Sequence, residues 1–175
     1  MFEEESMRRA VGILGAVWGV IGISLLLGRG LVCLVPYVME LSDVVLTGWQ
    51  GAALLSSVVL LGYVEGYKGF QLKFSPRAAA RVDVVRRMPT LPRVVLAPLF
   101  CMGFFDATKK RKIVAYGLTA MVILLILLVE RLPQPWRGIV DAGVLLGLSW
   151  GLVSFWIFTV RAFFGLGPAV DPELS

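Results

Sequence analysis

Residues 113–129 read IVAYGLTAMVILLILLV, an uncharged run that becomes almost pure Leu, Ile and Val in its second half. An α-helix rises about 1.5 Å per residue, so about 20 such residues cross the hydrocarbon core of a bilayer, which is about 30 Å thick. Three more uncharged runs of similar length lie at residues 10–27, 44–64 and 142–160. The sequence therefore predicts an all-α integral membrane protein with a bundle of four transmembrane helices.

The overall composition agrees with this class. Of the 175 residues, 58% are hydrophobic, which exceeds the roughly 45–50% of apolar residues in soluble domains. The length suits a single transmembrane domain over residues 1–175. We expect its spans at about 10–28, 44–66, 113–130 and 139–161, with residues 67–112 forming one long loop.

The distribution of charge predicts the orientation. Eleven of the 17 Lys and Arg residues lie in segment 65–112. With four spans, both chain ends fall on the same side as that segment and add Arg8, Arg9 and Arg161. The opposite side keeps only Arg29, Arg131 and Arg137. Because cytoplasmic loops carry an excess of Lys and Arg, the sequence predicts an N-in/C-in topology with a cytoplasmic loop at 67–112.

The first residues of the chain, MFEEE, are acidic. A secretory signal peptide begins with a basic region, and an organelle transit peptide is poor in acids and rich in Ser. We therefore expect the first span to be retained. The expected location is the bacterial inner (plasma) membrane, in a multi-pass protein.

The basic loop has internal structure of its own. Ser75 and Pro76 resemble the cap and first position of a short helix that stops before Pro89. Residues 94–105 are apolar but too short to cross, which favours an interfacial or re-entrant segment, with a flap packed on the bundle as the alternative. The loop is expected to contact anionic lipid headgroups or a partner protein, rather than nucleic acid, through Arg77, Arg81, Arg86, Arg87, Lys109, Lys110, Arg111 and Lys112.

Other local patterns concern the ends of the spans. Residues 28–30, Gly-Arg-Gly, predict a turn after the first span, followed by an interfacial segment at 31–39. Trp49 suits the outer membrane interface. Three ion pairs at helical spacing are expected: Glu65 with Lys68, Asp83 with Arg87, and Arg137 with Asp141.

Glycines repeat in phase on two spans. Gly12, Gly15, Gly19 and Gly22 share one face of the first span, and Gly143, Gly147 and Gly151 share one face of the fourth. Small residues let helix backbones approach closely in lipid, so both faces are expected to be packing surfaces. The pattern leaves open whether they join helices within the chain or between chains.

Catalytic and cofactor motifs are missing from the sequence. There is no histidine, and no phosphate-binding loop, dinucleotide fingerprint or CxxC motif occurs. The two cysteines, Cys33 and Cys101, are expected on opposite sides of the membrane and so unpaired. No catalytic residue, metal or cofactor is predicted, although aromatic residues in the last span leave a lipid, quinone or pigment site open.

The functional prediction is a non-catalytic accessory, assembly or structural subunit of a larger membrane complex. It would dock through its glycine faces and its basic loop, with membrane lipids and other membrane subunits as partners. A small oligomeric transporter or channel is the first alternative. A lipid-modifying enzyme that uses Glu65, Asp106 or Asp141 is the second.

Overall fold

The computed structural model describes residues 2–166 and 170–174, and in that part of the chain every regular element is a helix. The elements are α1 (Phe2–Met39), η1 (Glu40–Asp43), α2 (Gly48–Leu61), η2 (Gly62–Phe74), α3 (Ser75–Arg87), α4 (Leu91–Val95), α5 (Ala97–Met102), α6 (Lys109–Val129) and α7 (Trp136–Phe163).

Three helical segments are long and apolar enough to cross a membrane: Glu3–Asp43, Lys109–Val129 and Trp136–Phe163. The prediction of an all-α fold is therefore confirmed for the described residues, and these three segments suggest a membrane protein. The expected span at about 44–66 falls on α2 and the first turn of η2. It is not among these three segments, since α2 alone has only 14 residues.

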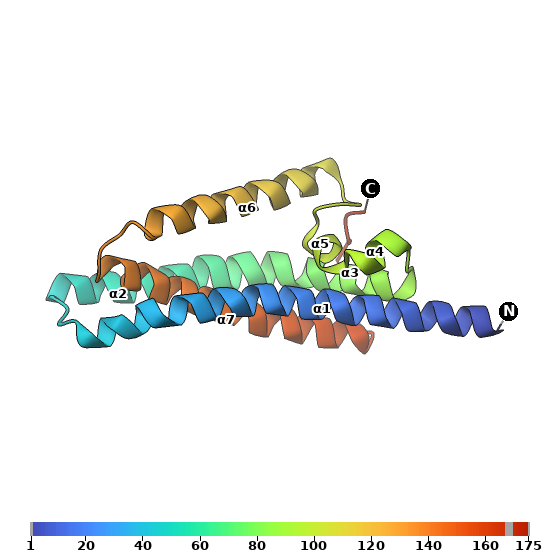
Figure 1. Ribbon diagram of the computed structural model, residues 1–175, viewed down its shortest axis with the longest axis horizontal. Coiled ribbons are helices and arrows are strands. Elements are labelled where there is room, and N and C mark those ends of the chain that lie inside the picture. Colours follow the sequence, from blue (N-terminus) through green and yellow to red (C-terminus); the bar gives the residue numbers. More distant parts are fainter. Residues whose placement is uncertain (1, 167–169, 175) are drawn as a thin grey trace.

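Helices α1, α7 and the continuous rod formed by α2, η2 and α3 lie side by side (Figure 1). The connections from α1 to α2 and from α6 to α7 lie at one end of the molecule. The N-terminus, the last described residues and α3, α4 and α5 lie at the other end (Figure 1). We call this second end the basic end, because it gathers most of the Lys and Arg residues.

Helix α1 continues through residues 28–30, so the predicted turn there is wrong. A glycine inside a helix costs about 1 kcal/mol relative to alanine, but tertiary packing routinely outweighs that preference. Gly30 lies against Leu148 of α7. Near the end of α1, the carbonyl oxygen of Tyr37 lies against Gly138 of α7. Residues 31–39 are thus the last turns of a helix packed on α7 instead of a separate interfacial segment.

The rod made of α2, η2 and α3 is helical throughout, but its hydrogen-bond pattern changes from α to π and back to α. Residues 62–74 form a π-helix, and the Ser75 amide donates to the carbonyl of Phe70, five residues back. Pro76 has no amide hydrogen, and its ring would clash with the carbonyl four residues back in a regular α-helix, so the wider register before it accommodates the proline. Ser75 is therefore a helix-interior residue, not the predicted cap.

The π-helical register also changes which side chains meet. Among the described residues no ion pair joins Glu65 to Lys68, and Lys68 instead lies over the ring of Tyr63 at 4.9 Å. The pairing predicted from α-helical spacing is wrong at this position because hydrogen bonds run i to i+5 here. The other two predicted pairs, Asp83 with Arg87 and Arg137 with Asp141, are confirmed.

The α7 glycines lie against α2 and η2. A Cβ atom on Gly143 would sit 2.5 Å from the hydroxyl oxygen of Ser57 and 2.7 Å from its carbonyl oxygen. A Cβ on Gly151 would sit 2.5 Å from the ring of Phe70, and one on Gly147 would meet Glu65 at 3.2 Å. These glycines allow the backbones of α7 and the rod to touch.

The α1 glycines face different neighbours. Gly12 lies against the Arg86 carbonyl at the end of α3, and a Cβ on Gly15 would meet Val85 at 2.9 Å and Val94 at 3.0 Å. Gly19 and Gly22 lie against α5, where a Cβ on Gly19 would approach Cys101 at 3.3 Å. The first glycine face therefore seats the loop helices, and not α7.

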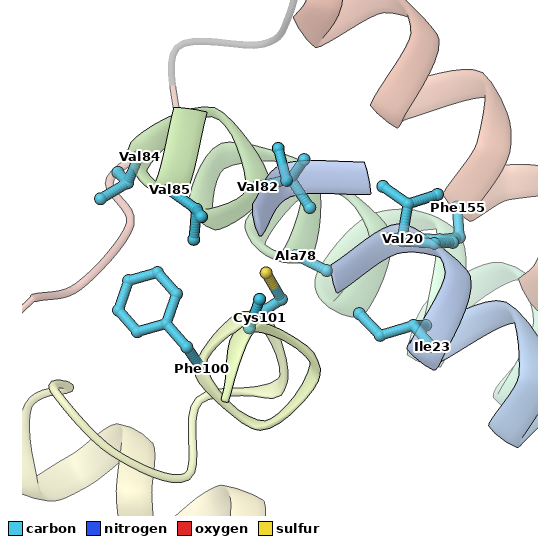
Figure 2. Packing of buried hydrophobic residues seen from close by; sticks show 11 residues of the cluster. Val20, Ile23, Ala78, Val82, Val84, Val85, Phe100, Cys101 and Phe155 are labelled. Atoms are coloured by element: carbon cyan, nitrogen blue, oxygen red, sulfur yellow. The ribbon is translucent and has the colours of Figure 1, made fainter. Parts of the chain in front are cut away.

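A buried hydrophobic cluster joins four elements at the basic end (Figure 2). Phe100 and Cys101 of α5 and Phe155 of α7 are fully buried in it. Their neighbours from α1 and α3 are Ala16, Val20, Ile23, Ala78, Val82, Val84 and Val85. Segment 94–105 is therefore a cover packed on α1 and α3, which is the flap arrangement.

A pair of glycine substitutions tests the close approach of α7. Gly143→Ala should lower the thermal unfolding midpoint in mild detergent, because overpacking against Ser57 costs about 1–3 kcal/mol. Gly117→Ala is the matched control on α6, where a Cβ would meet nothing within 4 Å. It should leave the midpoint unchanged or raise it. Equal midpoints for the two variants would contradict the packing described here.

Candidate functional site

The most organised polar site lies at the basic end and centres on Arg81 of α3. Its side chain is 1% exposed although it carries a full positive charge. A buried charge is tolerated only when it is paired and hydrogen-bonded. Its partners therefore show what the surrounding loops are built to do.

Carbonyl oxygens surround the Arg81 guanidinium. It donates to Phe100 at 2.9 Å, Phe105 at 3.4 Å, Asp106 at 3.3 Å and Glu173 at 3.1 Å, each time to the backbone carbonyl. The guanidinium also lies over the ring of Phe100 at 4.8 Å. One side chain thus ties α3 to α5, to the loop before α6 and to the C-terminal segment.

Burial alters the titration of this cluster. It lowers the pKa of Arg81, and the nearby charge of Arg111 lowers it further. Arginine nevertheless stays protonated in proteins. Burial also raises the pKa of the Cys101 thiol to about 12, against the opposing effect of Arg81. Cys101 is therefore a neutral packing residue and not a reactive thiol.

The turn before α6 holds an ion pair. Arg93 donates through Nε to the Asp106 carboxylate at 2.6 Å, and Asp106 itself has a positive φ of 48°. Gly103 has φ of 90°, and a Cβ there would lie 2.9 Å from Nε of Arg111. Glycine at 103 therefore both permits the left-handed turn and leaves room for the Arg111 side chain.

The C-terminal segment closes the site. The carboxylate of Glu173 lies between Nε of Arg77, at 3.7 Å, and Nε of Arg111, at 4.0 Å. The Glu173 carbonyl accepts from the Thr108 amide at 3.0 Å, and Leu174 packs against the hydrophobic cluster. We call the residues Arg77, Arg81 and Arg111 the arginine pocket.

The eight basic residues singled out in the sequence therefore have different environments. Arg81 and Arg111 are buried, while Arg86 and Arg87 both pair with Asp83. Lys109 and Lys110 are exposed at the start of α6, and Lys112 is half-buried. Sequence reasoning missed Arg93, Asp106 and Glu173 as partners in the site. An acidic residue in the C-terminal segment of a basic chain was the available signal for Glu173.

Each of the three acids considered for catalysis has different neighbours. Glu65 faces Gly147 on α7, Asp106 pairs with Arg93, and Asp141 pairs with Arg137 at 3.7 Å. Within the described ranges, no group of three or more acidic, Cys or His side chains could hold a metal ion. These acids do not assemble into one site.

Comparisons with known proteins add no identification. No protein-family model, curated protein or solved structure matches the chain.

Replacing Arg81 tests its place at the centre of the basic end. Arg81→Met keeps an unbranched apolar side chain but removes the guanidinium and leaves buried carbonyls without donors, and each such group costs about 1–3 kcal/mol. The thermal midpoint should therefore fall clearly. Arg9→Met removes the same charge from an exposed side chain and should change stability by no more than about 0.5 kcal/mol. Similar midpoints for both variants would overturn the assignment.

Proposed function

We propose that this protein is a non-catalytic accessory, assembly or structural subunit of a larger membrane complex, and that it docks through α6. One observation carries the proposal. Only 6% of the apolar window of α6 is buried, against 39% for the segment containing α1 and 33% for α7. Among the described elements, none packs along α6 (Figure 1).

Helix α6 is held at its two ends. At the basic end Tyr116 stacks edge-on against Phe104 and its hydroxyl donates to the Phe104 carbonyl at 3.4 Å. At the other end, Gln134 in the connection to α7 donates to Glu40 at 2.7 Å and to the Tyr37 carbonyl at 3.2 Å. Between these anchors, all side chains in segment 121–128 are exposed.

A partner helix is the occupant that fits this surface. In lipid, helices associate through dispersion and interhelical hydrogen bonds, because lipid tails are as apolar as Leu. The glycine faces, which the sequence offered for docking, are filled by α3, α5 and the rod within the chain. Docking through glycine faces is therefore replaced, in this proposal, by docking through α6.

A second apolar surface lies on the rod. A shallow, mainly apolar hollow on α2 and η2 is lined by Leu55, Ser56, Val59, Leu60 and Tyr63. A partner helix seated in this hollow would make contacts that the chain alone does not make. The single-chain structure supports such a partner because it leaves both surfaces open.

The proposal includes a fourth crossing and an orientation. Residues 48–66, in α2 and the first turn of η2, pack along α7 and would extend about 28 Å at 1.5 Å per residue. With that crossing, the basic end faces the cytoplasm of a bacterial inner (plasma) membrane. The exposed Lys109 and Lys110 then lie where anionic headgroups are found, each contributing about 1 kcal/mol of attraction.

Site-specific photocrosslinking in the native membrane tests the docking surface. A photoreactive residue at Leu124 of α6 should crosslink to another membrane protein at fixed stoichiometry. The matched control is Val153 of α7, a position 60% exposed on the packed core. It should give lipid adducts only.

Two outcomes would contradict the proposal. Lipid adducts alone from Leu124, under every mild extraction condition, would mean that α6 has no protein partner. Crosslinks only to second copies of this chain would favour a self-associating transporter or channel over an accessory subunit.

A further inference from the structure

We propose that the arginine pocket binds a phosphate-type anion and that the C-terminal segment 170–174 covers the pocket as an exchangeable stand-in. In the structure the carboxylate of Glu173 occupies the place of the anion. The inference deepens the proposed contact between the basic end and anionic headgroups. It does not depend on the docking of α6.

The fit between Glu173 and the pocket is incomplete. Its carboxylate lies 3.7 Å from Arg77 and 4.0 Å from Arg111, beyond the 2.7–2.9 Å of a good charge-assisted hydrogen bond. The Nε groups of Arg81 and Arg111 are buried and have no hydrogen-bond acceptor among the described residues. Buried donors without acceptors are rare in folded proteins, so the Nε of Arg111, 4.0 Å from the Glu173 carboxylate, marks a place where an acceptor would fit.

A phosphate monoester would supply both more acceptor oxygens and more negative charge than the Glu173 carboxylate. It carries about −1.5 to −2 charges at neutral pH and presents three strong acceptor oxygens, whereas a carboxylate has two oxygens and one charge. Guanidinium groups bind phosphate through paired, nearly parallel N–H donors. Arg77 and Arg111 face this one carboxylate, and the charge of Arg81 also acts on it, so positive charge is in excess. The carboxylate of Asp106 is already paired with Arg93.

The pocket can be reached from outside. The side chains of Arg77 and Glu173 are 31% and 35% exposed, so an incoming anion has a path to the Arg77 guanidinium. Arg111 lies two residues before Ile113, where the apolar part of α6 begins. If α6 crosses the bilayer, the pocket therefore sits at the depth of lipid headgroups.

The packing of Leu174 on the hydrophobic cluster and the polar contacts of Glu173 hold the covering segment. The Glu173 carbonyl accepts from Thr108 and Arg81, and the Glu173 amide donates to Asp171 at 2.8 Å. Thr108 also caps α6, since its hydroxyl accepts from the Arg111 amide at 3.3 Å. Displacing the segment would expose the Thr108 amide, which makes this amide a reporter of occupancy.

Hydrogen–deuterium exchange on the full chain tests the proposal. The chain is compared in nanodiscs of phosphatidylcholine alone, of phosphatidylcholine with phosphatidic acid, and of phosphatidylcholine with inorganic phosphate added. We expect the Thr108 amide to exchange faster when the phosphate-type anion is present. A response to phosphatidic acid only identifies the lipid headgroup, and a response to inorganic phosphate identifies the free anion. No response to either would overturn the proposal.

Three variants, assayed by phosphatidic acid or phosphate binding, distinguish binding in the arginine pocket from attraction of the anion by net positive charge. Glu173→Gln weakens the internal competitor and should tighten binding several-fold. Arg77→Gln should weaken binding by about tenfold, as expected for a lost charged hydrogen bond. Arg9→Gln removes an equal charge from the exposed N-terminal helix and should have little effect.

The variants also have outcomes that contradict the proposal. Equal losses for Arg77→Gln and Arg9→Gln would show that only net charge matters. Unchanged binding in Glu173→Gln, whose side chain is partly exposed and unneeded for the hydrophobic cluster, would show that the segment does not compete for the pocket. Failure of α6 to crosslink to a partner would leave all these outcomes unaffected.

Discussion

Close backbone approach at glycine is the constraint on which the architecture depends. Lipid tails provide no hydrophobic drive between helices, so contact surfaces must gain their energy from short-range packing. Gly143 and Gly151 bring α7 against the rod, while Gly15 and Gly19 bring the loop helices against α1. Helix α6 has Gly117 in open space and packs along nothing in the described chain.

A different interaction organises the basic end. Arg81 is buried among backbone carbonyls from three separate segments and lies over Phe100. A charge in such a place fixes α5 and the loop before α6, because moving either of them would leave that charge without most of its acceptors. The buried cluster beneath it, from Ile23 to Phe155, supplies the apolar packing. Together they position Arg77 and Arg111 around the acidic side chain of the C-terminal segment.

The sequence predicted the membrane class and the location of the long helices, because uncharged runs of about 18 residues or more are typical of membrane spans. It did not predict that α1 passes through residues 28–30, since local glycine preference is weaker than packing on α7. Counting charges to predict orientation takes no account of burial, so Arg81 was grouped with exposed residues. Its partners are backbone carbonyls, which every residue has and no sequence pattern marks. In-phase glycines indicate that something packs closely but not which element it is.

The separation of α6 from the packed core can be measured directly by electron paramagnetic resonance. Spin labels at Leu124 of α6 and Leu55 of α2, with Cys33 replaced by Ser and Cys101 left buried, would report the distance between them in nanodiscs. Because no described element packs along α6, we expect a distance well beyond the spacing of directly packed helices for the purified chain. A narrow distribution at the spacing of directly packed helices, whose axes lie about 8–10 Å apart, would contradict it.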